Sequence, residues 1–390
     1  MSTSFAMNSK PRFEILDGLR GVAAMIVVVF HLFETYSAGP CHQIINHGYL
    51  AVDFFFILSG FVIGYAYDDR WGRGMTQWDF YKRRLIRLQP MVIMGTLIGA
   101  FWFYFGDAPG FEFVMQTPWW KLLLIMLLGC LMFPTPPAMD IRGWQEVNSL
   151  NGAAWSLMWE YVANILYATV IRRFSRLALG IAVGLSALLT IDLCLNFDWF
   201  GLLEPRSYAA YTVIGGFGLT PDQIYIGLAR LFYPFFSGLL LYRLGWRVSF
   251  GMRGFLLTSL IMAVVLAMPH LGGDTPNALN GLYCAAVILL IFPVVVAAGA
   301  GSPLTGRRTT AVCKFLGAIS YPLYITHYPM IYVQMSWAAH HQDAPLGTHI
   351  WVAVWIFIAS IAVAYACLKV YDEPVRSWLA ARFIRKTAKN

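Results

Sequence analysis

The chain has 390 residues, of which 58% are hydrophobic and only 12% are charged. A soluble protein normally carries about 25% charged residues, so this composition excludes a soluble globular protein. The formal net charge is +8, but the basic residues lie in short loops between apolar runs and not in a nucleic-acid-binding patch. We therefore predict an integral membrane protein that binds no nucleic acid.

Eleven apolar segments follow one another along the chain, and several reach the roughly 20 residues that cross a bilayer as a helix. No soluble domain of useful size remains between or after them, which predicts a single all-α transmembrane domain over residues 1–390. The segments are 18–36, 49–67, 90–107, 119–133, 152–170, 176–197, 225–242, 254–270, 278–299, 312–335 and 350–371.

Clusters of Lys and Arg predict which loops face the cytoplasm, because positively charged loops are retained on that side. They place both the N-terminal segment 1–17 and the tail 372–390 in the cytoplasm. Two cytoplasmic termini require an even number of crossings. We therefore predict ten transmembrane helices and one segment, either 119–133 or 152–170, that enters the membrane without crossing it. The stretches predicted to be external are 37–48, 108–118, 198–224, 271–277 and 336–349.

The first apolar segment carries polar residues at alternating steps of three and four, which places them on one helix face. Arg20 and His31 are eleven residues apart, so they align with roughly 16 Å between them along the axis. This pattern predicts two functional side chains facing one channel at different depths. An interfacial Asp17–Arg20 ion pair and a packing role for His31 are the structural alternatives. The full stripe is Asp17, Arg20, Ala24, Val27, His31 and Glu34.

The second and third apolar segments add further candidates, because ionisable groups inside a membrane usually face a cavity or a partner. Asp53 and Ser59 lie in the second segment, where Gly60 and Gly64 favour close helix packing. Arg84 and Arg87 precede the third segment one turn apart and can hold one anion. Membrane topology alone is the alternative explanation for these arginines.

Later segments supply three more candidates. Glu160 is an intramembrane carboxylate, and Tyr324 and His327 share a face with Ser320 near two prolines. A hydrogen-bonding role within the bundle is the alternative for His327. We predict no disulfide framework, no metal site and no tightly bound cofactor, because the six cysteines are scattered and the histidines of the predicted external loops have no carboxylate or cysteine partner at ligand spacing. These histidines are His42, His47, His340, His341 and His349.

These pieces, in this order, resemble the motifs of the membrane acyltransferase 3 family over almost the whole chain. Tyr161 is a departure, because the family usually has a second acidic residue after the glutamate at Glu160. The matching motifs are Leu16-Asp-Gly-Leu-Arg-Gly21 with His31, Phe54-Phe-Phe-Ile-Leu-Ser-Gly-Phe61, Arg84-Leu-Ile-Arg87 with Pro90, Ala154-Trp-Ser-Leu157 with Glu160, Leu316-Gly-Ala-Ile-Ser-Tyr-Pro-Leu-Tyr-Ile-Thr-His-Tyr-Pro329, and Glu373-Pro374.

The resemblance implies a multi-pass protein of the bacterial cytoplasmic membrane that moves an acyl group, usually acetyl, from cytoplasmic acyl-CoA to a hydroxyl of a carbohydrate or related acceptor. Arg20, Arg84 and Arg87 would then hold the phosphates of the CoA co-substrate. His31 would act as general base, oriented by Glu34, with Asp17 as a further member of the catalytic stripe. An acyl-histidine intermediate is the rival chemistry.

A transporter or flippase for a sugar or an anionic substrate is the alternative function, because it would also place charges around a membrane cavity. No inverted repeat is evident, which weighs against it. The acceptor, the acyl chain and the oligomeric state are not specified by the sequence. Consumption of acetyl-CoA by the purified protein would discriminate between the two functions.

Overall fold

The computed structural model describes residues 12–106 and 116–384, and within these ranges the chain is built of helices and connecting segments. Each of the eleven predicted apolar segments lies on one or more helices, so the all-α prediction is confirmed for the described residues. The helices are α1 (Glu14–Glu34), α2 (Ala51–Trp71), α3 (Gln77–Phe105), α5 (Trp119–Cys130), α6 (Ala154–Thr169), α7 (Arg176–Leu195), α8 (Pro221–Leu244), α9 (Gly254–Ala267), α10 (Ala278–Ala286), α11 (Phe292–Gly301), α12 (Arg307–His340), α13 (Leu346–Cys367) and α14 (Glu373–Phe383).

Seven helical stretches among the described residues are long and apolar enough to cross a membrane. Two of them run through π-helical turns, Val287–Ile291 between α10 and α11 and Leu368–Asp372 between α13 and α14. Helix α12 has 34 residues but is more polar than these seven, because it buries Ser320, Thr326, His327 and Gln334. The structure therefore shows a multi-pass helical membrane protein, and the count of ten crossings stays a prediction.

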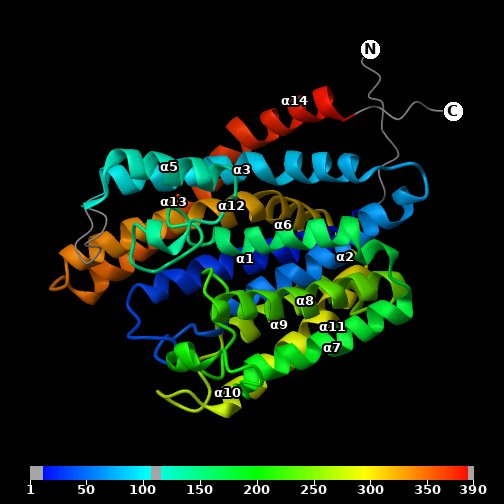
Figure 1. Cartoon of the computed structure of the whole chain (residues 1–390), viewed down its shortest axis with the longest axis horizontal. Coiled ribbons are helices and arrows are strands. Elements are labelled where there is room, and N and C mark those ends of the chain that lie inside the picture. Colours follow the sequence, from blue (N-terminus) through cyan, green and yellow to red (C-terminus); the bar gives the residue numbers. More distant parts are fainter. Residues whose placement is uncertain (1–11, 107–115, 385–390) are drawn as a thin grey trace.

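The two segments considered for the non-crossing role differ in the structure. Helix α5 has 12 residues, about 18 Å, whereas the hydrocarbon core is roughly 30 Å thick. Helix α6 has 16 residues. Figure 1 shows the chain turning back after α5, so that α6 starts near the end of the bundle where α5 began. This geometry favours α5 as the segment that does not cross.

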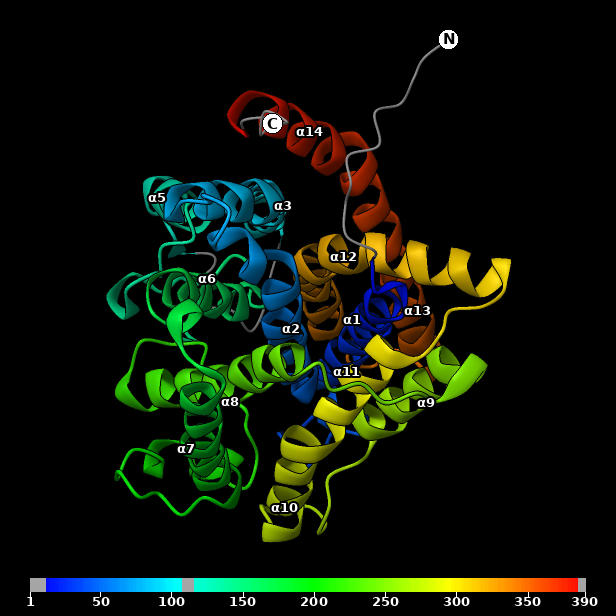
Figure 2. The ribbon, with the colours of Figure 1, turned by 90° about the vertical axis from the view of Figure 1, so that its right-hand side faces the viewer.

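Helix α1 occupies the middle of the bundle. Seen along the helices in Figure 2, α2, α11, α12 and α13 surround it, and it packs most extensively against α12. The close approach depends on glycines, because a Cβ on Gly21 would lie 2.5 Å from Leu316 and one on Gly317 would lie 2.8 Å from Asp17 Cβ. This contact brings the polar stripe of α1 against the polar face of α12.

Helices α2 and α8 approach each other in the same way. A Cβ on Gly60 would lie 2.1 Å from the carbonyl oxygen of Phe235, and one on Gly238 would lie 1.9 Å from that of Ile57. The predicted packing role of Gly60 is thus confirmed. Small residues of this kind allow backbones in a membrane to come close enough for side chains to hydrogen-bond between helices.

Figure 1 shows the start of α1 and the end of α14 at the same end of the bundle. This arrangement fits an even number of crossings. Which end faces the cytoplasm stays a prediction. The expected cytoplasmic segments 1–17 and 372–390 lie partly outside the described residues.

The loop charges predict a cytoplasmic C-terminus and an external connection between α12 and α13. A reporter that is active only in the cytoplasm is expected to be active when it is fused to the C-terminus. A single cysteine introduced at residue 343 is expected to react with a membrane-impermeant maleimide in intact cells. Reaction of a single tail cysteine from outside the cell would contradict the ten-crossing topology.

Candidate active site

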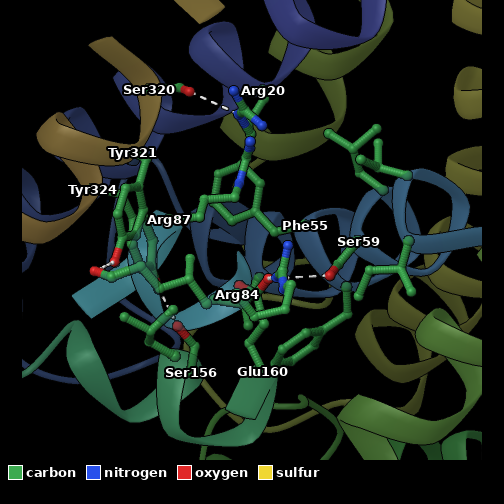
Figure 3. Close-up of a pocket in the computed structure, with 17 residues that line it drawn as sticks. Arg20, Phe55, Ser59, Arg84, Arg87, Ser156, Glu160, Ser320, Tyr321 and Tyr324 are labelled. Carbon is green, nitrogen blue, oxygen red and sulfur yellow. Dashed lines mark hydrogen bonds and ion pairs between the residues drawn. The ribbon is translucent and has the colours of Figure 1, made fainter. Parts of the chain in front are cut away.

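Two cavities in the bundle collect the polar residues of the membrane region. The first, here the arginine chamber, has a volume of about 100 Å³ and is lined by residues of α1, α2, α3, α6 and α12. Arg20, Arg84 and Arg87 all line it, so the structure brings the three predicted donor-binding arginines together (Figure 3). The other polar residues of its wall are Ser59, Ser156, Glu160, Ser320, Tyr321 and Tyr324.

Arg84 and Arg87 differ in their surroundings, although they are one turn apart on α3. Arg84 is buried and forms a short ion pair with Glu160, whose Oε1 also accepts a hydrogen bond of 3.2 Å from Ser59 Oγ. Arg87 is exposed along its side chain and points into the chamber beside Arg20 in Figure 3. The expectation that both arginines hold one anion is therefore refined, because Glu160 already neutralises Arg84.

Arg20 is held at the top of the arginine chamber by α12. Its Nε donates to Ser320 Oγ at 2.7 Å, and its Nη2 donates to the carbonyl oxygen of Gly317 at 3.0 Å. Asp17 lies one turn earlier, 3.4 Å from the same guanidinium. Asp17 is 14 residues before His31, roughly 21 Å along the helix. This distance places Asp17 as a positioning residue for Arg20 and not with the reacting groups at His31.

The second cavity, here the histidine chamber, has a volume of about 470 Å³ and lies around the last turns of α1. His31 and Glu34 line it, and the distance from His31 Nδ1 to Glu34 Oε2 is 2.6 Å. A carboxylate accepts the hydrogen bond, so Nδ1 carries the proton and Nε2 remains available as a base. The predicted orientation of His31 by Glu34 thus has the required geometry.

His327 lies directly behind His31, with ring centroids 5.3 Å apart. It is fully buried, and its Nδ1 donates to the carbonyl oxygens of Tyr324 at 2.9 Å and Leu323 at 3.1 Å. Its Nε2 has no hydrogen-bond partner among the described residues. His327 is not among the residues that line either chamber, so it supports the wall behind His31.

The two chambers meet at Val52 and Tyr324, which line both of them. The hydroxyl of Tyr324 and Ser156 Oγ are 2.7 Å apart, and the ring of Tyr324 packs edge-on against Phe55 at 5.4 Å. Arg20 lines one of these neighbouring chambers and His31 lines the other, so the structure places the two residues at different depths along α1.

Asp53 has a structural partner that sequence reasoning missed. It is fully buried and pairs with Arg230 of α8, from Nη2 to Oδ2 at 2.7 Å. Arg230 also donates to the carbonyl oxygen of Tyr49 and lines the histidine chamber. Arg230 interrupts the apolar segment 225–242, so an intramembrane arginine was the available signal. Asp53 therefore holds Arg230 and is not a free carboxylate of the site.

Tyr161, at the position where an acid was expected, donates a hydrogen bond of 2.7 Å to Gln89 Oε1. This hydroxyl is engaged away from the arginines, so Glu160 is the carboxylate that faces them. Glu146 is a second residue that sequence reasoning missed. It lines the histidine chamber from the segment between α5 and α6, which has no periodic pattern that could have singled it out.

Comparison with known proteins identifies the family to which this chain belongs. A family model described as an acyltransferase domain matches residues 13–369, so the chain is a member of this membrane acyltransferase family, and the resemblance noted in the sequence is confirmed. Two neighbouring cavities in a helical bundle, one lined by arginines and the other by a histidine–carboxylate pair, accord with acyl transfer.

Two relatives indicate the range of the family. "Protein 2 in picA locus" of Rhizobium radiobacter is 34% identical over 167 residues, which cover 40% of this chain and 81% of that protein. The peptidoglycan O-acetyltransferase of Listeria monocytogenes is 21% identical over 389 residues, which cover 93% of this chain and 55% of that protein. The chain thus spans about half the length of the Listeria relative. No solved structure matches the chain.

The Arg84–Glu160 pair generates a prediction about folding. Removing one partner of a buried ion pair costs about 3–5 kcal/mol, because the remaining charge is uncompensated. We expect Arg84→Ala to lower the yield of folded protein and its thermal midpoint in detergent, and the double variant Arg84→Met/Glu160→Leu to restore both.

Arg83→Ala is the matched control, because Arg83 is on the same helix and does not line the chamber. Equal stability of Arg84→Ala and Arg83→Ala would show that the ion pair does not support the fold.

Proposed function

We propose that the protein transfers an acyl group, most simply acetyl, from cytoplasmic acyl-CoA to a hydroxyl of a carbohydrate or related acceptor at the opposite face of the bacterial cytoplasmic membrane. The observation that carries this proposal is the shared wall at Tyr324 between the arginine chamber at one depth and the chamber with the His31–Glu34 pair at another. The relative named a peptidoglycan O-acetyltransferase supports an acetyl donor and a carbohydrate-containing acceptor.

The arginine chamber has the charge that an acyl-CoA donor requires. Arg87 and Arg20 present positive charge beside each other, and a guanidinium binds phosphate through two parallel hydrogen bonds. The chamber is smaller than the roughly 300–1,000 Å³ of ordinary ligand pockets. The nucleotide of CoA would therefore stay at the mouth of the chamber, while the narrow arm carries the thioester past Tyr324 toward His31.

The histidine chamber suits the reaction. His31 Nε2 takes the proton of the acceptor hydroxyl while the hydroxyl oxygen attacks the thioester carbonyl carbon. The C–S bond then breaks, and the CoA thiolate leaves and takes the proton back from the imidazolium. Glu34 holds the imidazole and stabilises its positive charge during the reaction. In the rival sequence of steps, His31 first accepts the acyl group itself and then passes it to the hydroxyl.

The separation of the chambers predicts opposite defects for two single variants. His31→Ala is expected to lower acyl transfer from acetyl-CoA by about 100- to 10,000-fold, because the general base is lost, while acetyl-CoA still binds. Arg87→Ala is expected to weaken acetyl-CoA binding by about tenfold or more, because a charge-assisted hydrogen bond is lost. Radiolabelled acetyl-CoA binding and ester formation, measured on the same detergent-purified samples, separate the two effects.

His42→Ala and Arg83→Ala are the matched controls. His42 is exposed in the loop after α1, and neither residue lines a chamber. Normal ester formation by well-folded His31→Ala protein would remove His31 from the reaction. A wild-type protein that moves a solute without consuming acetyl-CoA would favour the transporter alternative.

A further inference from the structure

Besides Glu34, the histidine chamber contains another carboxyl group, that of Glu146, which has no part in the proposed reaction. Glu34 is engaged by His31, but Glu146 enters the chamber from the segment between α5 and α6. Its Oε2 is shielded from solvent and has no hydrogen-bond partner among the described residues. Buried polar oxygens in proteins are almost always hydrogen-bonded, so an oxygen of this kind calls for a bound proton or a ligand.

The segment that carries Glu146 is held firmly in place. Asp140 accepts hydrogen bonds from the backbone amides of Arg142 at 3.0 Å and Gln145 at 2.7 Å. On the other side of Glu146, the amide of Val147 donates to the carbonyl oxygen of Phe217 at 2.8 Å. Backbone contacts on both sides fix the direction of the intervening side chain, as a binding residue requires.

The side chain of Arg142 contributes to the same arrangement. Its guanidinium lies 3.5 Å above the centre of the Tyr332 ring, and its Nε donates to the carbonyl oxygen of Ser149 at 2.6 Å. These contacts tie the segment to α12, whose Tyr328 lines the histidine chamber. Glu146 is thus set against the same wall as His31, since the rings of His31 and Tyr328 are 4.7 Å apart.

The rest of the chamber wall suits a sugar. Several aromatic side chains line it, and their flat apolar faces can pack against a sugar ring while polar groups bind its hydroxyls. These aromatic residues are Phe30, Tyr49, Trp144, Trp155, Tyr208, Phe217, Tyr324 and Tyr328.

We infer that Glu146 is an acceptor-binding residue, whose carboxyl group hydrogen-bonds a hydroxyl of the carbohydrate that is presented to His31. This inference rests on the function proposed above and adds to it a residue that selects and positions the acceptor.

Protonation explains how the Glu146 carboxyl group can bind an acceptor hydroxyl although Glu34 lies in the same chamber. Burial raises the pKa of Glu146 to about 8, with further increases from Glu34 and Asp140 and a decrease from Arg142. Below pH 8 the group is therefore neutral and donates a hydrogen bond to the acceptor. Above pH 8 it becomes an anion that only accepts and that repels Glu34. The titratable groups that face it are Arg142 and Asp140 from its own segment, Glu34 from α1, and Tyr328 and Tyr332 from α12.

Two variants of Glu146 test the inference with acetyl-CoA as donor and chitotetraose as the acceptor probe. Glu146→Ala is expected to lower kcat/KM for chitotetraose about tenfold or more, while the binding of acetyl-CoA stays unchanged. In the wild type, transfer is expected to fall as the pH rises past about 8. Glu146→Gln keeps a neutral donor at every pH, so it is expected to keep transfer and to lose this alkaline decline.

Glu204→Gln is the control, because Glu204 is exposed in the segment between α7 and α8 and does not line a chamber. An unchanged kcat/KM in Glu146→Ala, or an unchanged alkaline decline in Glu146→Gln, would overturn the inference. Loss of acetyl-CoA binding together with transfer in Glu146→Ala would also overturn it, because the residue would then be structural.

A binding measurement separates this inference from the proposed function. Chitotetraose is expected to raise the thermal midpoint of the wild type and of Glu146→Gln, but not that of Glu146→Ala. If the wild type transfers no acetyl group from acetyl-CoA but the three proteins show these thermal midpoints, the proposed function fails and the acceptor subsite is supported. Equal stabilisation of Glu146→Ala and the wild type would overturn the subsite.

Discussion

A charge inside a bilayer is costly unless it is paired or faces a water-filled cavity, and this constraint organises the membrane region of the protein. Asp53 and Arg230 satisfy it by pairing in a fully buried contact, and Arg84 does so with Glu160. Arg87 instead satisfies it by lining a chamber. Arg84 and Glu160 line the same chamber as a neutralised pair, and under the proposed function Arg87 is the charge that remains for a substrate. Charge pairing thus separates structural residues from functional ones within a single helix turn of α3.

Helix α1 contributes a polar residue to each of the two chambers. Close glycine contacts set α1 against α12, which holds Arg20 in the arginine chamber through Ser320. The same helix carries His31 three turns further along, where Glu34 orients it in the histidine chamber. The two chambers share Val52 and Tyr324 in their walls. Under the proposed function, this one helix would fix the spacing between the charge that attracts the donor and the base that activates a hydroxyl. Orientation of this kind removes much of the entropic barrier of a two-substrate reaction.

Helical periodicity was enough to predict the stripe of α1, because residues three and four apart must share a face. The same spacing singled out Arg84 and Arg87, and the cost of an ionisable group inside a membrane singled out Glu160. Neither predicted the pairing of Arg84 with Glu160, since that depends on how α3 packs against α6. Asp53 looked like a site residue because its partner Arg230 lies 177 positions away. Glu146 had no periodic signal at all, because an irregular segment brings it into the chamber. Local pattern therefore predicted the helices and their polar faces, while long-range packing decided which charges remain open.

The central claim is that donor and acceptor reach His31 from opposite faces of the membrane, the donor by way of Tyr324. Sealed proteoliposomes test it most directly, with chitotetraose trapped inside and acetyl-CoA added outside, using the fraction whose C-terminal tag is accessible from outside. The account predicts acetyl esters on the trapped oligosaccharide and their loss in His31→Ala. Esters that form only when both substrates share one compartment would contradict it.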